Sequence, residues 1–166
     1  MPGKKALATL QGARGYVDNP CAAWLNCDDG ALSDEQAVGL ELFMDKGGSA
    51  CHNSVNLGGN DYDPIGLIKK PGADVLPPDD RGRVTVTETA DNSYVFRAAP
   101  LRNIDQTAPR FHSGKVRDLK VAVQIMGTSQ LGTRINDQET DQIAALLGAL
   151  IGRMPKVIYP VLPAET

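Results

Sequence analysis

The sequence has few residues that can bind a metal or carry out acid–base catalysis. Its 166 residues include two histidines, three cysteines and four methionines. No second Cys/His pair stands at the spacing that a zinc finger needs. Neither histidine lies near a G-x-S-x-G segment, and no P-loop or dinucleotide-binding fingerprint is present. These absences argue against a zinc finger, a serine hydrolase and a nucleotide-binding enzyme.

Aromatic residues, basic stripes and long apolar runs are also scarce. Aromatics make up 5% of the chain, which suits either a buried flat cofactor or a helical core rich in Ala, Leu and Val. The formal net charge is −3, and no basic stripe with interleaved aromatics predicts a nucleic-acid partner. No apolar run approaches the roughly 18 residues of a membrane span. No apolar segment follows Lys4 and Lys5, so we expect no signal peptide in this chain.

The cysteines divide into a pair and a single residue. Cys21 and Cys27 lie six positions apart, and they either form a disulfide in an oxidising compartment or remain free thiols. Both alternatives leave Cys51 for other chemistry.

Cys51 and His52 follow a glycine-rich turn and form part of a haem-attachment pattern. In C-x-x-C-H, two cysteines bond the haem vinyl groups and the histidine binds the iron. Gly48 stands where the first cysteine would be. A Cys–His pair in such a loop also occurs without any cofactor, so this string alone leaves both interpretations open.

Helix signals dominate the chain. Ser33 and Gln36 form a capping box before a predicted helix over Asp34–Lys46, whose apolar face would include Val38, Leu42 and Phe43 and which Gly47 ends. Two more helices are predicted over Val116–Met126, ended by Gly127, and over Asp137–Ile151, where Asn136 and Glu139 form a second capping box. Gly39 and Gly148 would let the first and last of these helices cross closely.

The remaining segments predict short or irregular structure, and the class is mostly α. We expect a short helix at 4–10, loops at 18–30 and 56–80, a small hairpin of 84–87 with 94–96, a helical turn from Leu101, and an extended strap over 156–166. Residues 1–30 would form an N-terminal extension on a domain that covers 31–166.

Few residues could complete an iron site around His52. The sixth ligand would be His112, a methionine or none, and Met126 at a helix end is a candidate, although from the residues alone plain core packing is the favoured interpretation of Met126. A His/Met haem has no open site and transfers electrons, whereas a His-only haem could react with peroxide. His112, Arg97 and Arg102 could contact haem propionates or simply lie on the surface.

These segments together resemble the C-terminal haem domain of bacterial di-haem cytochrome c peroxidases. The similarity covers most of residues 30–163, in order, and is carried by ALSDEQAVGLELFMDKG (31–47), CHNSVNLGG (51–59), PLRNIDQTAPRFHSGKV (100–116), AVQIMGTSQLG (122–132) and PKVIYPVLP (155–163). The resemblance implies a mostly α, cytochrome c-like haem domain located in the periplasm.

The resemblance also assigns roles to individual residues. It implies that His52 is the proximal ligand and Met126 the distal ligand of the electron-accepting haem, with Cys51 as the second linking cysteine. It implies that the backbone carbonyls of Thr107 and Pro109 help to bind calcium between two domains. The implied partners are a small electron-donor protein of cytochrome or cupredoxin type and a peroxidatic haem domain, with a homodimer as a further arrangement.

Two departures from the family pattern shape the expectations. Gly48 replaces the first linking cysteine, so haem c would be held by one thioether at Cys51, or not covalently, or not at all. A chain of 166 residues has room for one haem domain, so we expect it to lack the peroxide-reducing domain and to be inactive as a peroxidase alone. The rival hypotheses are a haemless scaffold of the same fold and a peroxidase with five-coordinate haem at His52.

Overall fold

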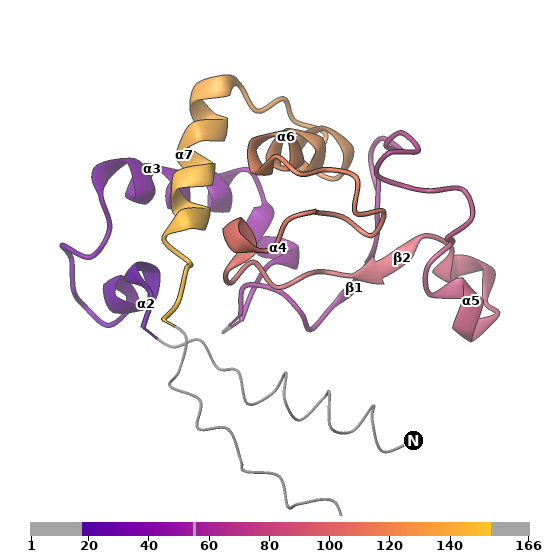
Figure 1. Ribbon diagram of the computed structural model, residues 1–166, viewed down its shortest axis with the longest axis horizontal. Helices are drawn as coiled ribbons and strands as arrows, with labels where there is room; N and C mark the ends of the chain where they lie inside the picture. Colours follow the sequence, from indigo (N-terminus) through magenta and orange to yellow (C-terminus); the bar gives the residue numbers. More distant parts are fainter. Residues whose placement is uncertain (1–17, 55, 154–166) are drawn as a thin grey trace, which may run out of the picture.

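The computed structural model describes residues 18–54 and 56–153, which form a small, mainly helical domain with one short sheet (Figure 1). The predicted mostly α class is confirmed. The short helix expected at 4–10 and the strap expected over 156–166 lie outside the described residues. Within the described ranges, no helix is long and apolar enough to cross a membrane.

Two helices far apart in the sequence form the centre of the fold. Helix α3 (Asp34–Asp45) packs against α7 (Asp137–Gly148), and each begins with the predicted capping box. In α3 the Ser33 side chain accepts from Gln36 N, and in α7 the Asn136 side chain accepts from Glu139 N. Both predicted starts are therefore confirmed, and α7 ends three residues before the predicted boundary.

Gly39 lets α3 and α7 approach each other closely. A Cβ atom at Gly39 would lie 2.0 Å from the carbonyl oxygen of Gln142 on α7, so no larger residue fits without separating the helices. The predicted role of Gly39 is confirmed, whereas that of Gly148 is wrong, because no atom lies within 4 Å of a Cβ built there. Val38 was predicted to lie on the apolar face of α3. This prediction is wrong, because the residue is 39% exposed.

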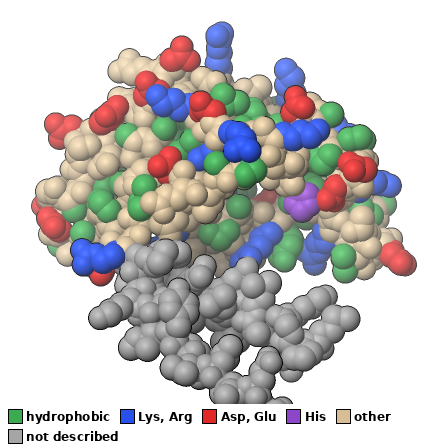
Figure 2. All heavy atoms as spheres, in the orientation of Figure 1, with side chains coloured by type: hydrophobic (Ala, Val, Ile, Leu, Met, Phe, Trp, Pro, Cys, Tyr) green, Lys and Arg blue, Asp and Glu red, His purple; other side chains and the backbone are tan. Residues whose placement is uncertain are grey.

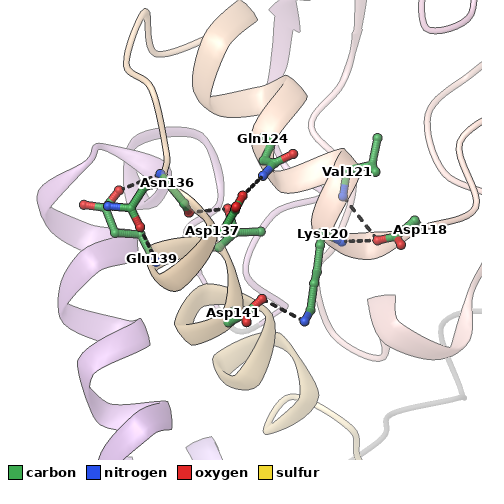
Figure 3. A network of polar contacts seen from close by, with 9 residues as sticks. Asp118, Lys120, Val121, Gln124, Asn136, Asp137, Glu139 and Asp141 are labelled. Atoms are coloured by element: carbon green, nitrogen blue, oxygen red, sulfur yellow. Dashed lines mark hydrogen bonds and ion pairs between the residues drawn. The ribbon is translucent and has the colours of Figure 1, made fainter.

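Helix α6 (Leu119–Ser129) lies beside α7 and is joined to it by polar contacts (Figure 3). Gln124 Nε2 donates to Asp137 Oδ1 at 3.2 Å, and Lys120 Nζ lies 2.7 Å from Asp141 Oδ1. The helix begins later than predicted, because Asp118 caps it by accepting from the backbone N–H of Lys120. It also continues past the predicted stop at Gly127, whose missing side chain leaves room for Ile135.

A further helix, α2 (Pro20–Leu25), replaces the loop predicted over 18–30. The Asn19 side chain caps it by accepting from Ala22 N, and Pro20 occupies the first turn, where its missing N–H costs nothing. Cys21 faces the core and Cys27 is exposed, and both are free thiols, as is Cys51. Of the two alternatives for Cys21 and Cys27, the structure therefore has the free thiols.

The sheet pairs strands that the sequence did not predict to be partners. Strand β1 (Tyr62–Pro64) lies antiparallel to β2 (Val95–Arg97), with Asp63 opposite Phe96. The predicted hairpin is wrong in its first strand, because Val84–Thr87 forms the short helix α5. The remaining elements are the four-residue helix α4 (Gly48–Cys51) and the 3-10 helices η1 (Ala90–Asn92) and η2 (Ile104–Gln106), the last of which lies just after the helical turn predicted from Leu101.

The apolar core lies mainly between α2, α3, α6 and α7. Its largest cluster of buried residues is Cys21, Leu32, Val123, Ile135, Ile143, Leu147, Ala149 and Leu150. A second cluster comprises Val75, Val116 and Ala122. On the face shown in Figure 2, acidic and basic side chains are interspersed.

Candidate functional site

The Cys51–His52 pair lies at the end of a short helix that follows α3 almost directly. Gly47, with a φ of +92°, takes the left-handed conformation that ends α3, as predicted, and α4 begins at the next residue. Cys51 is the last residue of α4, and the backbone N–H of His52 donates to Gly48 O at 3.0 Å. The pair is therefore held in a turn of helix rather than in the open loop that was expected.

A second segment supports this turn from 40 to 50 residues further along the chain. Gly59 N donates to Ala98 O at 2.7 Å, Ala98 N donates to Asp61 O at 2.9 Å, and Leu101 N donates to Leu57 O at 3.0 Å. These bonds place the segment 98–101 alongside 57–61. As a result, the carbonyl of Ala99 points at the His52 ring, whose Nδ1 lies 3.1 Å from the carbonyl oxygen.

This contact determines which nitrogen of His52 carries the proton. A carbonyl oxygen only accepts, so Nδ1 must be the protonated atom and Nε2 keeps its lone pair. Burial of the ring lowers the pKa of His52 below its ordinary value, although hydrogen bonds to the carbonyls of Ala99 and Leu57 oppose that shift. A neutral imidazole fixed through one nitrogen is the usual arrangement of a metal-binding histidine.

Gly58 makes room for the Ala99 carbonyl. A Cβ at this residue would lie 2.5 Å from Ala99 O and 3.1 Å from His52 Nδ1, and its φ of +118° is one that L side chains rarely adopt. The His52–Ala99 contact therefore depends on glycine at this position.

Phe43 covers the position of the missing cysteine. A Cβ at Gly48 would lie 2.5 Å from Cε2 of Phe43, and the Phe43 ring centroid is 6.4 Å from that of His52. The space beside α4 where a first linking cysteine would begin is therefore filled by an aromatic ring. The sequence showed the substitution, and the structure shows what occupies its place.

The Cys51 thiol lies beside an acidic residue of β1. Burial raises the pKa of Cys51, and the charge of Asp63 together with a hydrogen bond to that carboxylate raises it further. The environment of Cys51 therefore favours the protonated thiol over the thiolate. Asp63 was not among the predicted site residues, because nothing in the local sequence links β1 to α4.

Met126 lies in the last turn of α6 and is half buried. The end of this helix is tied to the segment that follows β1: Gln130 donates from Nε2 to Pro64 O at 3.0 Å, and its Oε1 accepts from Gly66 N at 3.0 Å. Ser129 O accepts from the backbone N–H groups of Ile68 and Lys69. The same strand therefore neighbours Cys51 at Asp63 and is fastened to the helix end that carries Met126.

The arginines named as contacts for propionates, Arg97 and Arg102, flank the segment 98–101. Arg97 donates from Nε to Gly59 O at 2.6 Å, which fastens β2 to the glycine turn after His52. Arg102 is half buried, and its backbone N–H donates to Asn56 O at 3.4 Å.

His112 lies next to the sheet and contacts Asp80. Its Nε2 is 2.5 Å from Asp80 Oδ2, and its ring centroid is 4.6 Å from that of Phe96. The pKa of Asp80 is lowered first by the N–H of Gly82 and then by His112. At 53% exposure of its side chain, His112 is engaged with protein groups at the surface.

Thr107 and Pro109 lie in an exposed loop, and the buried side chain of Arg110 hydrogen-bonds to the backbone on either side of it. The buried Arg110 guanidinium donates from Nη2 to the carbonyls of Ile104 and Asp105, and from Nη1 to the carbonyl of Arg117. A shallow cavity of about 500 Å³ lies beside this loop, and its lining includes Ala108 and Arg110 but neither Cys51 nor His52.

The described part of the chain contains no group of three or more His, Cys, Asp or Glu side chains arranged to hold a metal ion. A metal bound at His52 would therefore need ligands of another kind, such as a porphyrin with an axial thioether. Sequence reasoning identified Cys51 and His52 but missed Ala99, Gly58 and Asp63. The repeated glycines at 58 and 59 were the one local signal for the close backbone approach.

Comparison with known proteins gives a consistent result. The chain is 54% identical over 149 residues to a cytochrome c551 peroxidase of Pseudomonas aeruginosa, which covers 90% of this chain and 43% of that protein. It is 37% identical over 140 residues to a cytochrome c551 peroxidase of Nitrosomonas europaea, covering 84% of this chain and 41% of that protein. The crystal structure of a MauG-like protein associated with microbial copper homeostasis matches with a TM-score of 0.67 at 22% identity, over 82% of this chain and 52% of that one. No protein-family model matches the chain.

The helices, the minimal sheet and this structural likeness define a small cytochrome c-like domain. The sequence relatives are cytochrome c peroxidases, which is consistent with the bacterial di-haem cytochrome c peroxidase family. The chain spans less than half of the length of the peroxidases named above.

Proposed function

We propose that this chain is an electron-transfer haem domain of a di-haem cytochrome c peroxidase. In this proposal Cys51 forms a single thioether to the haem, and His52 and Met126 bind its iron. The observation that carries the proposal is the His52–Ala99 contact of 3.1 Å, which leaves Nε2 of His52 available to bind iron. The residue immediately before His52 is Cys51, a free cysteine. The relatives' names, which describe cytochrome c peroxidases, support the choice of haem c.

The chain's own residues perform the positioning. Ala99 fixes the ring and the tautomer of His52, and burial keeps the imidazole uncharged, so that its lone pair is available at neutral pH. Burial and the neighbouring Asp63 raise the pKa of Cys51, the residue that would form the thioether. When bound, the haem supplies a one-electron Fe(III)/Fe(II) couple, and His/Met ligation gives that couple a raised potential and no open site.

The wider assignments follow from the family and belong to the same proposal. The domain would receive electrons from a small cytochrome or cupredoxin in the periplasm and pass them to a peroxidatic haem domain. Calcium would bind at the carbonyls of Thr107 and Pro109 between the two domains, and Arg110 holds the backbone just before this loop through the carbonyls of Ile104 and Asp105. Arg102 and His112 would contact the haem edge or its surroundings, and a homodimer is a further expected assembly.

The proposal is tested by purifying the chain after co-expression with cytochrome c maturation proteins in an oxidising compartment. Denaturing mass spectrometry should show one covalent haem, and the absorption spectrum should show a Soret band. Met126→Leu should abolish the spectral signature of methionine sulfur bound to iron. Met44→Leu, at a methionine that is 48% exposed on α3, should leave this signature unchanged. An unaltered spectrum in Met126→Leu would favour the five-coordinate peroxidase instead.

One observation favours a second function, a haemless interaction domain of the same fold. Phe43 fills the place of the first linking cysteine, and the core is already closed around α3 and α7. A chain that folds cooperatively but takes up no haem under full maturation conditions would support this alternative.

A further inference from the structure

The loop that follows β1 exposes two large apolar side chains and two lysines in succession. Leu67 is 65% exposed and Ile68 is 63% exposed, and Lys69 and Lys70 are exposed beside them. No ion pair in the described part of the chain involves either lysine. Adjacent apolar side chains that remain in water, with charged residues at their rim, are typical of a surface that another protein covers.

Contacts with the end of α6 and with the sheet hold loop 67–70 in place (Figure 1). Ser129 O accepts from the backbone N–H of Ile68 at 3.0 Å and from that of Lys69 at 3.1 Å. The Lys70 ammonium lies 4.4 Å from the centroid of the Tyr94 ring, which keeps its charge at this surface. Side chains on a backbone that is already ordered lose little conformational entropy when a partner covers them.

The same helix end joins loop 67–70 to Met126. The backbone N–H of Gln130 donates to Met126 O at 2.9 Å, and the Gln130 side chain accepts from the N–H of Gly66, the residue before Leu67, at 3.0 Å. A single residue is therefore bonded both to the proposed iron ligand and to the loop. A protein that covers the loop would stand beside the helix end that carries Met126.

The charge of loop 67–70 distinguishes between partners. In a symmetric dimer centred on this loop, the same surface would face itself, so Lys69 and Lys70 would meet two further lysines. Such like-charge contacts are unfavourable, whereas an acidic partner is attracted and steered to the same surface. Complexes that form briefly for electron transfer also bury little area, so a short loop is a sufficient contact.

We infer that loop 67–70 is the docking surface for a small electron-donor protein whose own contact patch is apolar at its centre and acidic at its rim. This inference rests on the function proposed above. In the encounter one electron passes from the donor to the ferric iron. A cupredoxin donor changes from Cu(I) to Cu(II), the iron changes from Fe(III) to Fe(II), and no bond forms or breaks.

The test is a binding titration of the purified haem-loaded chain, followed by the NMR signals of its ¹⁵N-labelled backbone amides. The probe is a plastocyanin with an acidic face, kept as Cu(I). We expect the amide signals of residues 66–70 to shift, and the affinity to fall between about 20 mM and about 300 mM salt because salt screens the attraction.

Variants at exposed positions separate the apolar contribution from the charge. Leu67→Gln and Lys69→Gln should each raise the Kd about threefold, and the double variant about tenfold. Leu25→Gln, at an apolar residue of α2 that is 70% exposed, is the matched control for Leu67→Gln. Lys120→Gln, at the other end of α6, is the matched control for Lys69→Gln. Both controls should change the Kd less than roughly twofold.

Each result decides the inference. Absence of shifts at 66–70 in a chain that carries haem, or an unchanged Kd in the double variant, would overturn it and leave the proposed function intact. Tighter binding of a basic mitochondrial cytochrome c than of plastocyanin would overturn the acidic assignment. Dimers of the wild-type chain that Leu67→Gln dissociates, seen by sedimentation, would make a second copy the occupant. A chain without haem, detected by mass spectrometry before any titration, overturns the proposed function and the inference with it.

Discussion

His52 donates from Nδ1 to the carbonyl oxygen of Ala99, a residue 47 positions further along the chain. The contact exists because the segment 98–101 hydrogen-bonds to the glycine turn that follows His52. It fixes the ring and selects the tautomer in which Nδ1 carries the proton and Nε2 does not. Two residues that the local motif does not contain, Ala99 and Gly58, thereby become part of the site.

Gly58→Ala should weaken the His52–Ala99 contact. The new Cβ would lie 2.5 Å from Ala99 O in a backbone conformation with a φ of +118°, so the turn must shift, at a cost of about 1–3 kcal/mol in the free energy of unfolding. Chemical denaturation measures this cost, and the ratio of Soret to 280 nm absorbance measures haem occupancy. Gly72→Ala is the control, because no atom lies within 4 Å of a Cβ there, and equal stability of the two variants would contradict the prediction.

Gly39→Ala should separate α3 from α7. Its Cβ would lie 2.0 Å from Gln142 O, which is backbone and cannot rotate away, so we expect a loss of about 1–3 kcal/mol or more. Gly148→Ala, in the partner helix, meets no atom within 4 Å and should be neutral or stabilising, by up to about 1 kcal/mol, because alanine favours the helix. Thermal and urea unfolding of the two variants measure the difference, and a Gly39→Ala variant as stable as wild type would show that the helices can move apart freely.

Gly48→Cys should not restore two-point haem attachment efficiently by itself. The new Cβ would lie 2.5 Å from Cε2 of Phe43, so the ring has to move before the second sulfur can reach a vinyl group. Gly48→Cys combined with Phe43→Leu relieves the overlap and should give more doubly attached haem. The pyridine haemochrome spectrum distinguishes one saturated vinyl group from two. Equal yields of doubly attached haem with and without Phe43→Leu would show that the ring is no obstacle.

The ion pair between Lys46 and Glu139 should make the stability of the domain depend on acid. The Lys46 ammonium, 2.9 Å away, and the N–H of Asn136 lower the pKa of Glu139 in the folded state below its ordinary 4.5. A carboxyl with a lowered folded-state pKa stabilises the protein fully above its unfolded-state pKa, and that stabilisation is lost as the pH falls through the folded-state value.

Glu139→Gln tests this dependence. The variant keeps an oxygen that can accept from Asn136 N but loses the charge, so its melting temperature should fall less than that of wild type between about pH 6 and pH 3. Glu41→Gln, at an exposed position of α3, is the control. Parallel melting curves for wild type and Glu139→Gln across this range would refute the prediction.

Capping signals determined much of the fold because they act within a few residues. Ser33 with Gln36, and Asn136 with Glu139, fix the starts of α3 and α7 through contacts three residues apart, and both were predictable. Asn19 before Pro20 is an equally local helix-start signal. The prediction of a loop over 18–30 did not take it into account. The strand predicted at Val84–Thr87 is wrong for the opposite reason, because a non-local contact overrides the local signal. The β-branched residues favour a strand, but their expected partner, Val95 with its neighbours, pairs with β1 instead.

The sequence by itself determined the Cys51–His52 pair, the vacant cysteine position at Gly48, the two capped helices and the resemblance to a family, since each depends on residue identity and order along the chain. Tertiary structure alone decided that the Ala99 carbonyl selects the tautomer of His52 and that the Asp63 carboxylate lies beside Cys51. The physical reason is the distance along the chain. Backbone pairing between 57–61 and 98–101 and between β1 and β2 brings these groups together, and no local pattern encodes those partners.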